Sequence, residues 1–430
     1  MSQVFSNPRF QSKGSFTLEG EPSVSEPRLT VIERVARNIL HKQFGQLQTG
    51  LLRLKDSGGT TFFGHQDTGL QATVEVHNPR FYRRVLREGS LGAAESYLEG
   101  EWYTDDLTSL LRLLWQNQKT LQGIGQGSSW FAGLLVRIAH LLRDNTLAGS
   151  RRNIHEHYDL GNDFFQLFLD ETMMYSSAYF EREDCSLKEA SEAKLDLICR
   201  KLQLAPEDHV LEIGTGWGGF AEHAARQYGC RVTTTTISQE QYDFAQQRIN
   251  TAGLSDRVEI LLQDYRTLTG NYDKLVSIEM IEAVGHRHLD QYFQVCSDRL
   301  KPDGTMLIQA ITIPDQRFEQ YGRSVDFIQK YIFPGGALPS QGAMLKSTSR
   351  TDLRLIDLQD YASHYARTLR EWRGRFMSRY AEIEKLGFDT RFRRMWEYYF
   401  CYCEAAFTER ATGVAHLVFA KPEARLEVTS

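Results

Sequence analysis

A glycine-rich turn behind a short apolar run constrains this chain more than any other part of its sequence. Residues 210–213 read as a strand, and Glu212 stands near its end. The turn holds Gly214, Gly216, Gly218 and Gly219. Because glycine lacks a Cβ, it allows a tight turn and lets a ligand touch the backbone. Amide dipoles at the start of the following helix favour a negative group nearby. The pattern predicts a nucleotide pocket at the edge of an α/β sheet.

Two kinds of nucleotide compete for this turn. Gly214, Gly216 and Gly219 satisfy the G-x-G-x-x-G pattern of dinucleotide-binding oxidoreductases, which is weak evidence by itself. That pattern should bring an acidic residue about 20 positions later to hold the ribose. The next strand, residues 231–236, has no carboxylate at its tip, whereas Glu212 suits a ligand with a cationic amino-acid moiety. We therefore favour S-adenosylmethionine over NAD, and a turn without ligand is the third interpretation.

Two further strands bring polar residues to the same edge. Residues 260–265 read as a strand that ends in Asp264 and Tyr265, a pair able to cap an adenine. Residues 274–282 place Glu279 and Glu282 near the carboxyl end of another strand, where ligands bind in open α/β sheets. On a strand these two carboxylates would face opposite sides, but on a turn they could share one. We expect Glu282 to take part in chemistry and Glu279 to be structural.

Composition excludes several classes of protein. With 430 residues the chain is long enough for two domains, and a net charge of −5 gives no basic field for nucleic acid. The six cysteines are scattered, and His286 and His288 lack a third ligand at suitable spacing, so we expect no metal site. The polar N-terminus predicts no signal peptide, and no apolar run is long enough to predict a transmembrane segment. Reduced thiols in the cytoplasm are the default expectation.

The chain divides into four expected segments. Residues 1–27 are rich in Ser, Pro, Glu and Gly and are predicted to be disordered. Residues 28–115 predict a small α+β domain, with helices from residue 29 and residue 80 and strands at 50–54 and 70–76. Residues 116–150 predict a linker and an amphipathic helix that either meets a membrane interface or packs between domains. Residues 151–430 alternate helix and strand, as a doubly wound catalytic domain should.

Short blocks along the C-terminal part carry a family resemblance. They are residues 157–163 (HYDLGND), 174–180 (MYSSAYF), 211–219 (LEIGTGWGG), 236–241 (TISQEQ), 263–266 (QDYR), 279–285 (EMIEAVG), 330–336 (KYIFPGG) and 364–369 (HYARTL). In this order, residues 150–421 resemble the cyclopropane-fatty-acyl-phospholipid synthase family of S-adenosylmethionine-dependent methyltransferases. Residues 70–115 also resemble the N-terminal domain of the bacterial enzymes in that family.

This resemblance implies a fold and a cosubstrate site. The fold would be a class I methyltransferase, a Rossmann-like doubly wound sheet, with a small α+β N-terminal domain. The residues expected around S-adenosylmethionine are Tyr175, Ser176, Leu211, Glu212, Gly214, Gly216, Trp217, Gly218, Gly219, Thr236, Ile237, Ser238, Gln241, Asp264 and Tyr265.

The resemblance also implies a bound bicarbonate that acts as the base. Its site maps to Ser177, Glu282, Gln309, Ile311 and Tyr365. Family synthases usually carry cysteine where this chain has Ser177, and histidine where it has Gln309. Without the histidine, the anion loses a cationic partner and its basicity changes, although glutamine can still donate hydrogen bonds to it.

Cys403 matches a cysteine that the family was once thought to use in catalysis, so we include it among the catalytic candidates. Alkene methylation does not require a thiol. A cysteine within an aromatic helical segment is more often part of the core.

The expected reaction transfers the methyl carbon of S-adenosylmethionine to the double bond of an unsaturated phospholipid acyl chain. Methyl transfer leaves a carbocation, so the pocket must align the reactants and exclude water. Loss of a proton from the new methyl group with ring closure would give a cyclopropane, which is our expected product. If a hydride shifts first, loss of a methyl proton would give an exocyclic methylene chain instead. Methylene or methyl-branched acyl chains, which some relatives make, are therefore the alternative product. Two further hypotheses are methylation of a small molecule and binding of a lipid or cofactor without catalysis.

Such a substrate places the enzyme at the cytoplasmic face of a membrane as a peripheral protein. The helical run Arg80, Arg83, Arg84 and Arg87 could meet anionic headgroups or could be an ordinary solvated face. A homodimer formed through the N-terminal domain is expected by family analogy alone.

Overall fold

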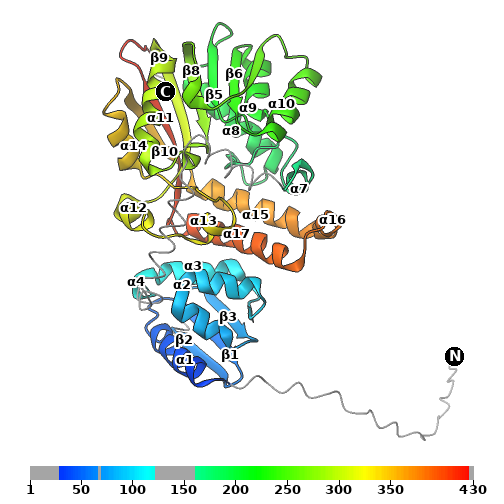
Figure 1. Cartoon of the computed structure of the whole chain (residues 1–430), viewed down its shortest axis with the longest axis vertical. Coiled ribbons are helices and arrows are strands. Elements are labelled where there is room, and N and C mark those ends of the chain that lie inside the picture. The colour runs from blue at the N-terminus through cyan, green and yellow to red at the C-terminus, as the bar shows by residue number, and fades with distance from the viewer. Residues whose placement is uncertain (1–28, 66–68, 122–159, 426–430) are drawn as a thin grey trace, which may run out of the picture.

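The structure, a computed structural model, describes residues 29–65, 69–121 and 160–425. Two sheets lie at opposite ends of the molecule, with the long helices α15 and α17 between them (Figure 1). No helix in these ranges is long and apolar enough to cross a membrane. The expected amphipathic helix at residues 130–143 lies outside the described residues.

The N-terminal unit is built on a sheet with the strand order β2-β1-β3-β4. Strand β1 pairs antiparallel with β2 and parallel with β3. The elements of this unit are α1 Val31–Phe44, β1 Leu51–Asp56, β2 Gly59–Gly64, β3 Gln71–Val76, α2 Arg80–Leu98, β4 Trp102–Tyr103, α3 Leu107–Gln116 and α4 Gln118–Leu121. The side chain of Thr30 and that of Glu33 cap each other's backbone N–H groups at the start of α1, which fixes where that helix begins.

The helices at residues 29 and 80 and the strands at 50–54 and 70–76 are confirmed. Strand β2 was not predicted, because it is an edge strand with only Phe63 buried and so shows no clear alternation. Residues 91–98 continue α2 beyond a kink at Gly89, where φ is 58°.

The second sheet has the strand order β10-β11-β9-β8-β5-β6-β7. Strands β5 to β9 run parallel, and β11 pairs antiparallel with β9 and β10. The strands are β5 His209–Ile213, β6 Arg231–Thr236, β7 Val258–Leu262, β8 Tyr272–Ile278, β9 Leu300–Thr312, β10 Arg354–Asp360 and β11 Gly413–Ala420. Every residue of β10 is exposed, which explains why the hydrophobic pattern does not reveal this strand.

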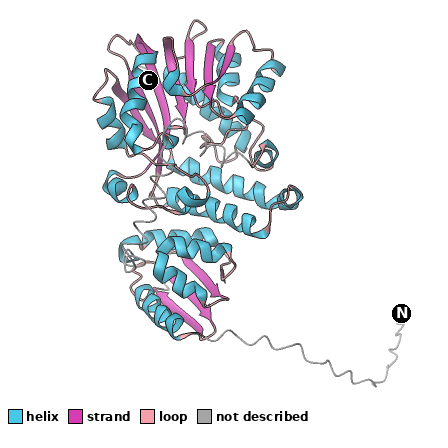
Figure 2. Ribbon diagram, viewed as in Figure 1, coloured by secondary structure: helices cyan, strands magenta, loops and turns pink. Residues whose placement is uncertain are grey.

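Helices cover both faces of this sheet (Figure 2). Alternate residues of the strands point to opposite faces of the sheet and form two hydrophobic cores. Val210 and Val232 pack against α8 to α10 on one face. Leu211 and Ile308 pack against α11 and α14 on the other. The helices are α7 Asn162–Gln166, α8 Leu187–Leu202, α9 Gly219–His223, α10 Gln239–Thr251, α11 Leu289–Arg299, α12 Asp315–Tyr321, α13 Phe327–Tyr331, α14 Gln341–Thr348, α15 Ala362–Ser378, α16 Tyr380–Lys385 and α17 Thr390–Thr408. This arrangement is the doubly wound sheet that the sequence predicts.

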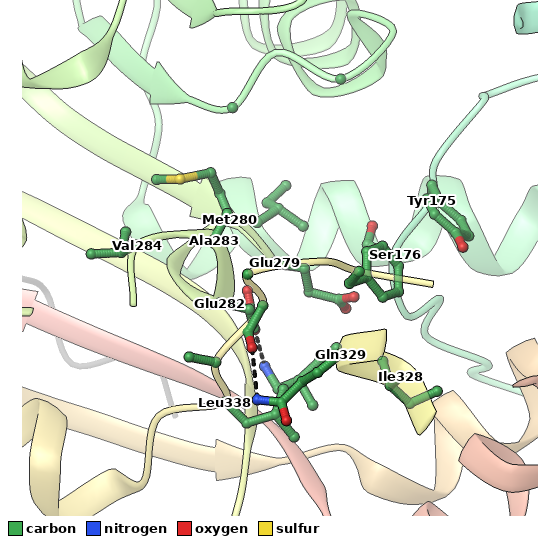
Figure 3. Close-up of a pocket in the computed structure, with 18 of the residues that line it drawn as sticks. Tyr175, Ser176, Glu279, Met280, Glu282, Ala283, Val284, Ile328, Gln329 and Leu338 are labelled. Carbon is green, nitrogen blue, oxygen red and sulfur yellow. Dashed lines mark hydrogen bonds between the residues drawn. The ribbon is translucent and has the colours of Figure 1, made fainter. Parts of the chain in front are cut away.

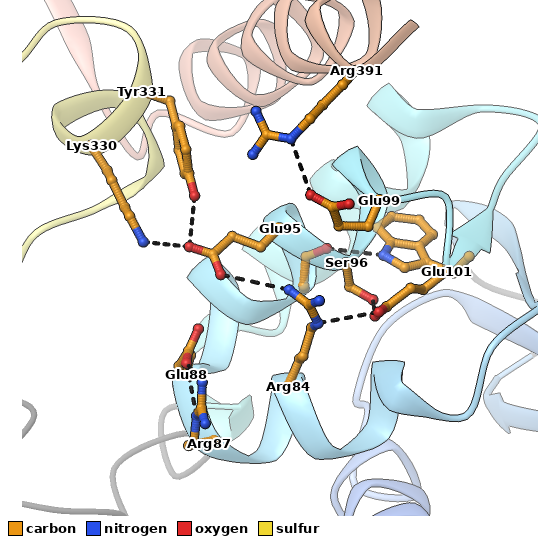
Figure 4. A network of polar contacts seen from close by, with 12 residues as sticks. Arg84, Arg87, Glu88, Glu95, Ser96, Glu99, Glu101, Lys330, Tyr331 and Arg391 are labelled. Carbon is orange, nitrogen blue, oxygen red and sulfur yellow. Dashed lines mark hydrogen bonds and ion pairs between the residues drawn. The ribbon is translucent and has the colours of Figure 1, made fainter.

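A polar network joins α2 to the helices around α17 (Figure 4). Glu95 accepts a hydrogen bond of 2.8 Å from the Tyr331 hydroxyl, and Glu99 pairs with Arg391 at 3.0 Å. Two arginines of the α2 run pair within the helix's own unit, Arg84 with Glu101 at 3.2 Å and Arg87 with Glu88. These pairs favour a structural role for part of that run.

Glu404 anchors the contact between the N-terminal unit and α17. Its side chain is 2% exposed and accepts hydrogen bonds from Arg370 at 2.9 Å and from the Thr108 hydroxyl at 3.3 Å. Arg373 lies 3.3 Å from its second oxygen. A buried carboxylate needs such partners, because an unpaired buried charge is strongly unfavourable.

We expect Glu404→Ala to lower the free energy of unfolding by about 3 kcal/mol, because two arginines lose their buried partner. Glu409→Ala is the matched control: Glu409 pairs with Arg112, which is 32% exposed, and its loss should cost less than about 1 kcal/mol. Urea unfolding of both variants measures the difference. Equal losses would contradict the role assigned to Glu404.

Candidate active site

A cavity of about 340 Å³ lies at the carboxyl edge of the large sheet and reaches to α17. One end is formed by the glycine turn after β5 and by the tips of β6 and β7. The other end is apolar and includes Ile328, Phe333, Leu338, Ala406 and Phe407. The cavity therefore joins a polar sheet edge to an apolar chamber.

The glycine turn forms the polar end. Gly214 and Gly216 have φ values of 105° and 53°, which only glycine adopts readily. The N–H of Gly214 donates to the Thr235 carbonyl at 3.1 Å, so the turn is tied to β6. A Cβ on Gly219 would come within 2.9 Å of the Thr172 carbonyl, which explains glycine there.

Glu212 is buried directly before this turn. It accepts a hydrogen bond of 2.6 Å from Thr234, and burial raises its pKa to about 8. At the tip of β6, Thr236 donates to Gln241 at 2.8 Å, and at the tip of β7 a double contact with Arg266 holds Asp264.

Most residues expected to hold the cosubstrate line this cavity. They are Tyr175, Ser176, Glu212, Gly214, Gly216, Trp217, Thr236, Ile237, Gln241, Asp264 and Tyr265. Leu211, Gly218, Gly219 and Ser238 do not line it. Leu211 is instead buried in the sheet core, and Ser238 caps the start of α10. Gly218 and Gly219 lie at the start of α9, where neighbouring residues leave little room for a Cβ.

Two carboxylates enter the middle of the cavity from the turn after β8. Glu279 has a φ of 48°, which costs a non-glycine residue about 1 kcal/mol. A short 3₁₀ helix, Ile281–Ala283, follows and carries Glu282. Both side chains point into the same space (Figure 3), the arrangement expected for a turn.

Glu279, which we expected to be structural, occupies the centre of a hydrogen-bond network. Its Oε1 accepts from the Ser177 N–H at 2.8 Å and from the Gln309 side chain at 2.7 Å. Its Oε2 accepts from the Tyr365 hydroxyl at 2.7 Å. Burial raises the pKa of Glu279, and these three donors oppose that rise by favouring the charged form.

Glu282 lies in a different environment. Its Oε1 accepts from the Ile311 N–H, and its Oε2 is buried without a hydrogen-bond partner. Burial and the nearby charge of Glu279 raise the pKa of Glu282 to about 8. Glu282 is therefore mostly protonated at pH 7, whereas the three donors around Glu279 favour its ionised form.

Lys194 and His416 contact residues that lie beside Glu279, and the sequence analysis does not identify either of them. The Lys194 ammonium donates to Ser176 at 2.8 Å, and burial lowers its pKa to about 8. His416 on β11 bonds the Gln309 side-chain oxygen at 2.9 Å, which directs the Gln309 amide toward Glu279. Two features of the sequence could have identified them: Lys194 lies on the apolar face of the helix at 187–202, and His416 lies within an apolar strand.

Cys403 lines the apolar part of the cavity, where burial raises the pKa of its thiol. A neutral thiol is a weak nucleophile. Around it the aromatic rings pack closely: Tyr365 stacks on Phe407 at 4.5 Å between centroids, and the Tyr175 hydroxyl bonds that of Tyr399 at 3.1 Å. Within the described ranges, no three His, Cys, Asp or Glu side chains are placed to hold a metal ion.

The chain is similar to known proteins over most of its length. The family model for mycolic acid cyclopropane synthetase matches residues 146–417. The chain is 42% identical over 341 residues to a tuberculostearic acid methyltransferase of Mycobacterium tuberculosis, covering 77% of this chain and 79% of that protein. It is 40% identical over 363 residues to the cyclopropane-fatty-acyl-phospholipid synthase of Escherichia coli, covering 81% and 88%.

Solved structures confirm the predicted fold. The mycolic acid cyclopropane synthase CmaA1 in complex with SAH and CTAB superposes with a TM-score of 0.60 and 32% identity, covering 63% of this chain and 98% of that one. Coclaurine N-methyltransferase, at 20% identity and a TM-score of 0.58, shares the fold. The chain thus belongs to the mycolic acid cyclopropane synthetase family and is an S-adenosylmethionine-dependent methyltransferase.

Proposed function

We propose that this enzyme transfers the methyl group of S-adenosylmethionine to the double bond of an unsaturated phospholipid acyl chain. The observation that carries the proposal is a cavity that joins a nucleotide-type turn to an apolar chamber, with buried carboxyl groups between them. A relative named as a phospholipid synthase, 40% identical over 81% of this chain, supports the same substrate class.

The polar end would hold the cosubstrate. Glu212 would bind the amino-acid part, Gln241 the ribose and Asp264 the adenine, since all three line this end of the cavity. The glycine turn lets the ligand approach the backbone closely. When bound, S-adenosylmethionine supplies an electrophilic methyl group.

The apolar end would hold the acyl chain. Phe333, Tyr399 and Phe407 line the cavity, and aromatic walls of this kind would keep water from the reacting carbons. Aromatic faces also stabilise a cation through their quadrupole, so they suit the carbocation that methyl transfer leaves. Holding the methyl group and the double bond close together and in line would contribute further to the rate.

The product that we propose is a cyclopropane ring. A methylene or methyl-branched chain is the second candidate, and the 42% identity to a protein named for tuberculostearic acid favours it. The departures at Ser177 and Gln309 bear on this choice, because both residues contact the Glu279 carboxylate.

We also propose that the enzyme meets its lipid at a membrane surface on the cytoplasmic side. Helix α1 supports a surface contact, because Val31, Ile32, Val35 and Ile39 are all at least 40% exposed along it. Dimerisation through the N-terminal unit stays a prediction.

Expression in a host with unsaturated phospholipids, fed methionine labelled in its methyl group, tests the function. We expect label in phospholipid acyl chains and a mass increase of one CH₂ group. Ozonolysis then separates the products, because it cleaves a methylene chain and leaves a cyclopropane intact. Label in water-soluble products alone, or no label above an empty vector, would reject the proposal.

The cosubstrate site is tested by Gly216→Ala, with Gly253→Ala as its matched control. Both glycines have positive φ, 53° and 69°, and a Cβ on either meets no atom within 4 Å. Each variant should lose about 1 kcal/mol of stability through backbone strain. Only Gly216 lines the cavity, so only its variant should bind S-adenosylhomocysteine about tenfold or more weakly. Calorimetry measures the binding. An unchanged affinity of Gly216→Ala for S-adenosylhomocysteine would contradict a role of the glycine turn in binding the cosubstrate.

A further inference from the structure

The groups expected to hold bicarbonate are already engaged by protein carboxylates. The Ser177 N–H, the Gln309 amide and the Tyr365 hydroxyl all donate to Glu279. The Ile311 N–H donates to Glu282. A bicarbonate ion at this place would compete with Glu279 for each donor and would lie against its negative charge. The residues present therefore do not fit an additional anion.

The backbone of Glu279 points to the same conclusion. Its φ of 48° is one that glycine adopts without strain and glutamate does not. Its own N–H is held by the Gln309 carbonyl at 2.7 Å, so the turn is fixed at this residue. A strained residue that places a carboxylate among three donors is typical of a functional position.

The charge of Glu279 is also balanced within the protein. Lys194 is buried behind Ser176, and its ammonium favours the ionised form of Glu279. Glu282, which shares the cavity, accepts the Ile311 N–H and carries an unpartnered oxygen. Of the two carboxyl groups, Glu279 therefore has the hydrogen-bond donors that a buried carboxylate requires, and Glu282 does not.

We infer that Glu279 is the catalytic base of this enzyme and takes the place of a bound bicarbonate. The inference rests on the proposed function. Methyl transfer forms a bond between the methyl carbon and one alkene carbon, the C–S bond breaks, and its electron pair stays on sulfur. A proton then passes from the new methyl group to Glu279 Oε2, and the C–H electron pair closes the ring onto the cationic carbon. If a hydride shifts first, the same proton loss forms an exocyclic double bond instead.

Tyr365 is then a positioning residue for the base. Tyr365→Phe removes a donor to the charged form, so the pKa of Glu279 should rise further. The other groups that face Glu279 are Ser177, Gln309, Glu282 and Lys194, and the variant leaves them in place. The acid limb of the pH–rate profile should move to higher pH, with KM for S-adenosylmethionine nearly unchanged. An unmoved acid limb would contradict the coupling between Tyr365 and Glu279.

The decisive experiment measures lipid methylation by the full-length protein in CO₂-free buffer and with added bicarbonate. Wild type should react equally fast in both. Glu279→Gln should lose kcat by about 100-fold or more, since it removes the base. Glu207→Gln, an exposed carboxylate outside the cavity, is the matched control and should behave as wild type. Wild type that needs bicarbonate, or Glu279→Gln at full rate, would overturn the inference.

Glu279→Gly supplies the complementary result. Glycine relaxes the backbone at this φ and frees the three donors, so added bicarbonate should restore part of the lost rate. A folded Glu279→Gly protein that bicarbonate does not restore would contradict the view that these donors form an anion site. Failure of wild type to methylate lipid under either condition would count against the proposed function. Bicarbonate dependence of an active wild type would count against this inference alone.

Discussion

The arrangement of the active site depends on one buried carboxylate and the three hydrogen bonds that stabilise it. The donors to Glu279 come from separate parts of the fold: Ser177 from the loop before α8, Gln309 from β9 and Tyr365 from α15. Because a buried charge without partners is very costly, these elements are held at fixed distances from the turn after β8. The same contacts that make the charge tolerable thus define the geometry in which a substrate would react.

The helical layer between the sheets serves two structural purposes. On one side α15 and α17 present Tyr365, Tyr399 and Phe407 to the cavity. On the other side α17 presents Glu404 to Thr108 of the N-terminal unit. Packing at one surface of α17 therefore affects the chamber at the other, since protein interiors are close-packed and transmit small displacements.

Local features of the sequence predict much of this molecule, and contacts between distant residues account for what they miss. The glycine turn and the apolar strands are visible because their signals span a few adjacent residues. Strands β2 and β10 are not, because little of either is buried. The central place of Glu279 depends on a backbone turn that no periodicity encodes. Lys194 and His416 interrupt apolar patterns, and only the folded structure shows that each has a polar partner.

Trp115, from α3 of the N-terminal unit, lines the same cavity and lies 5.1 Å from the Arg317 guanidinium. The chamber wall is thus shared by two parts of the chain that are far apart in sequence. Removal of the first 121 residues from this enzyme would therefore take away Trp115 and its contact with Arg317, and with them the part of the cavity wall that the N-terminal unit supplies.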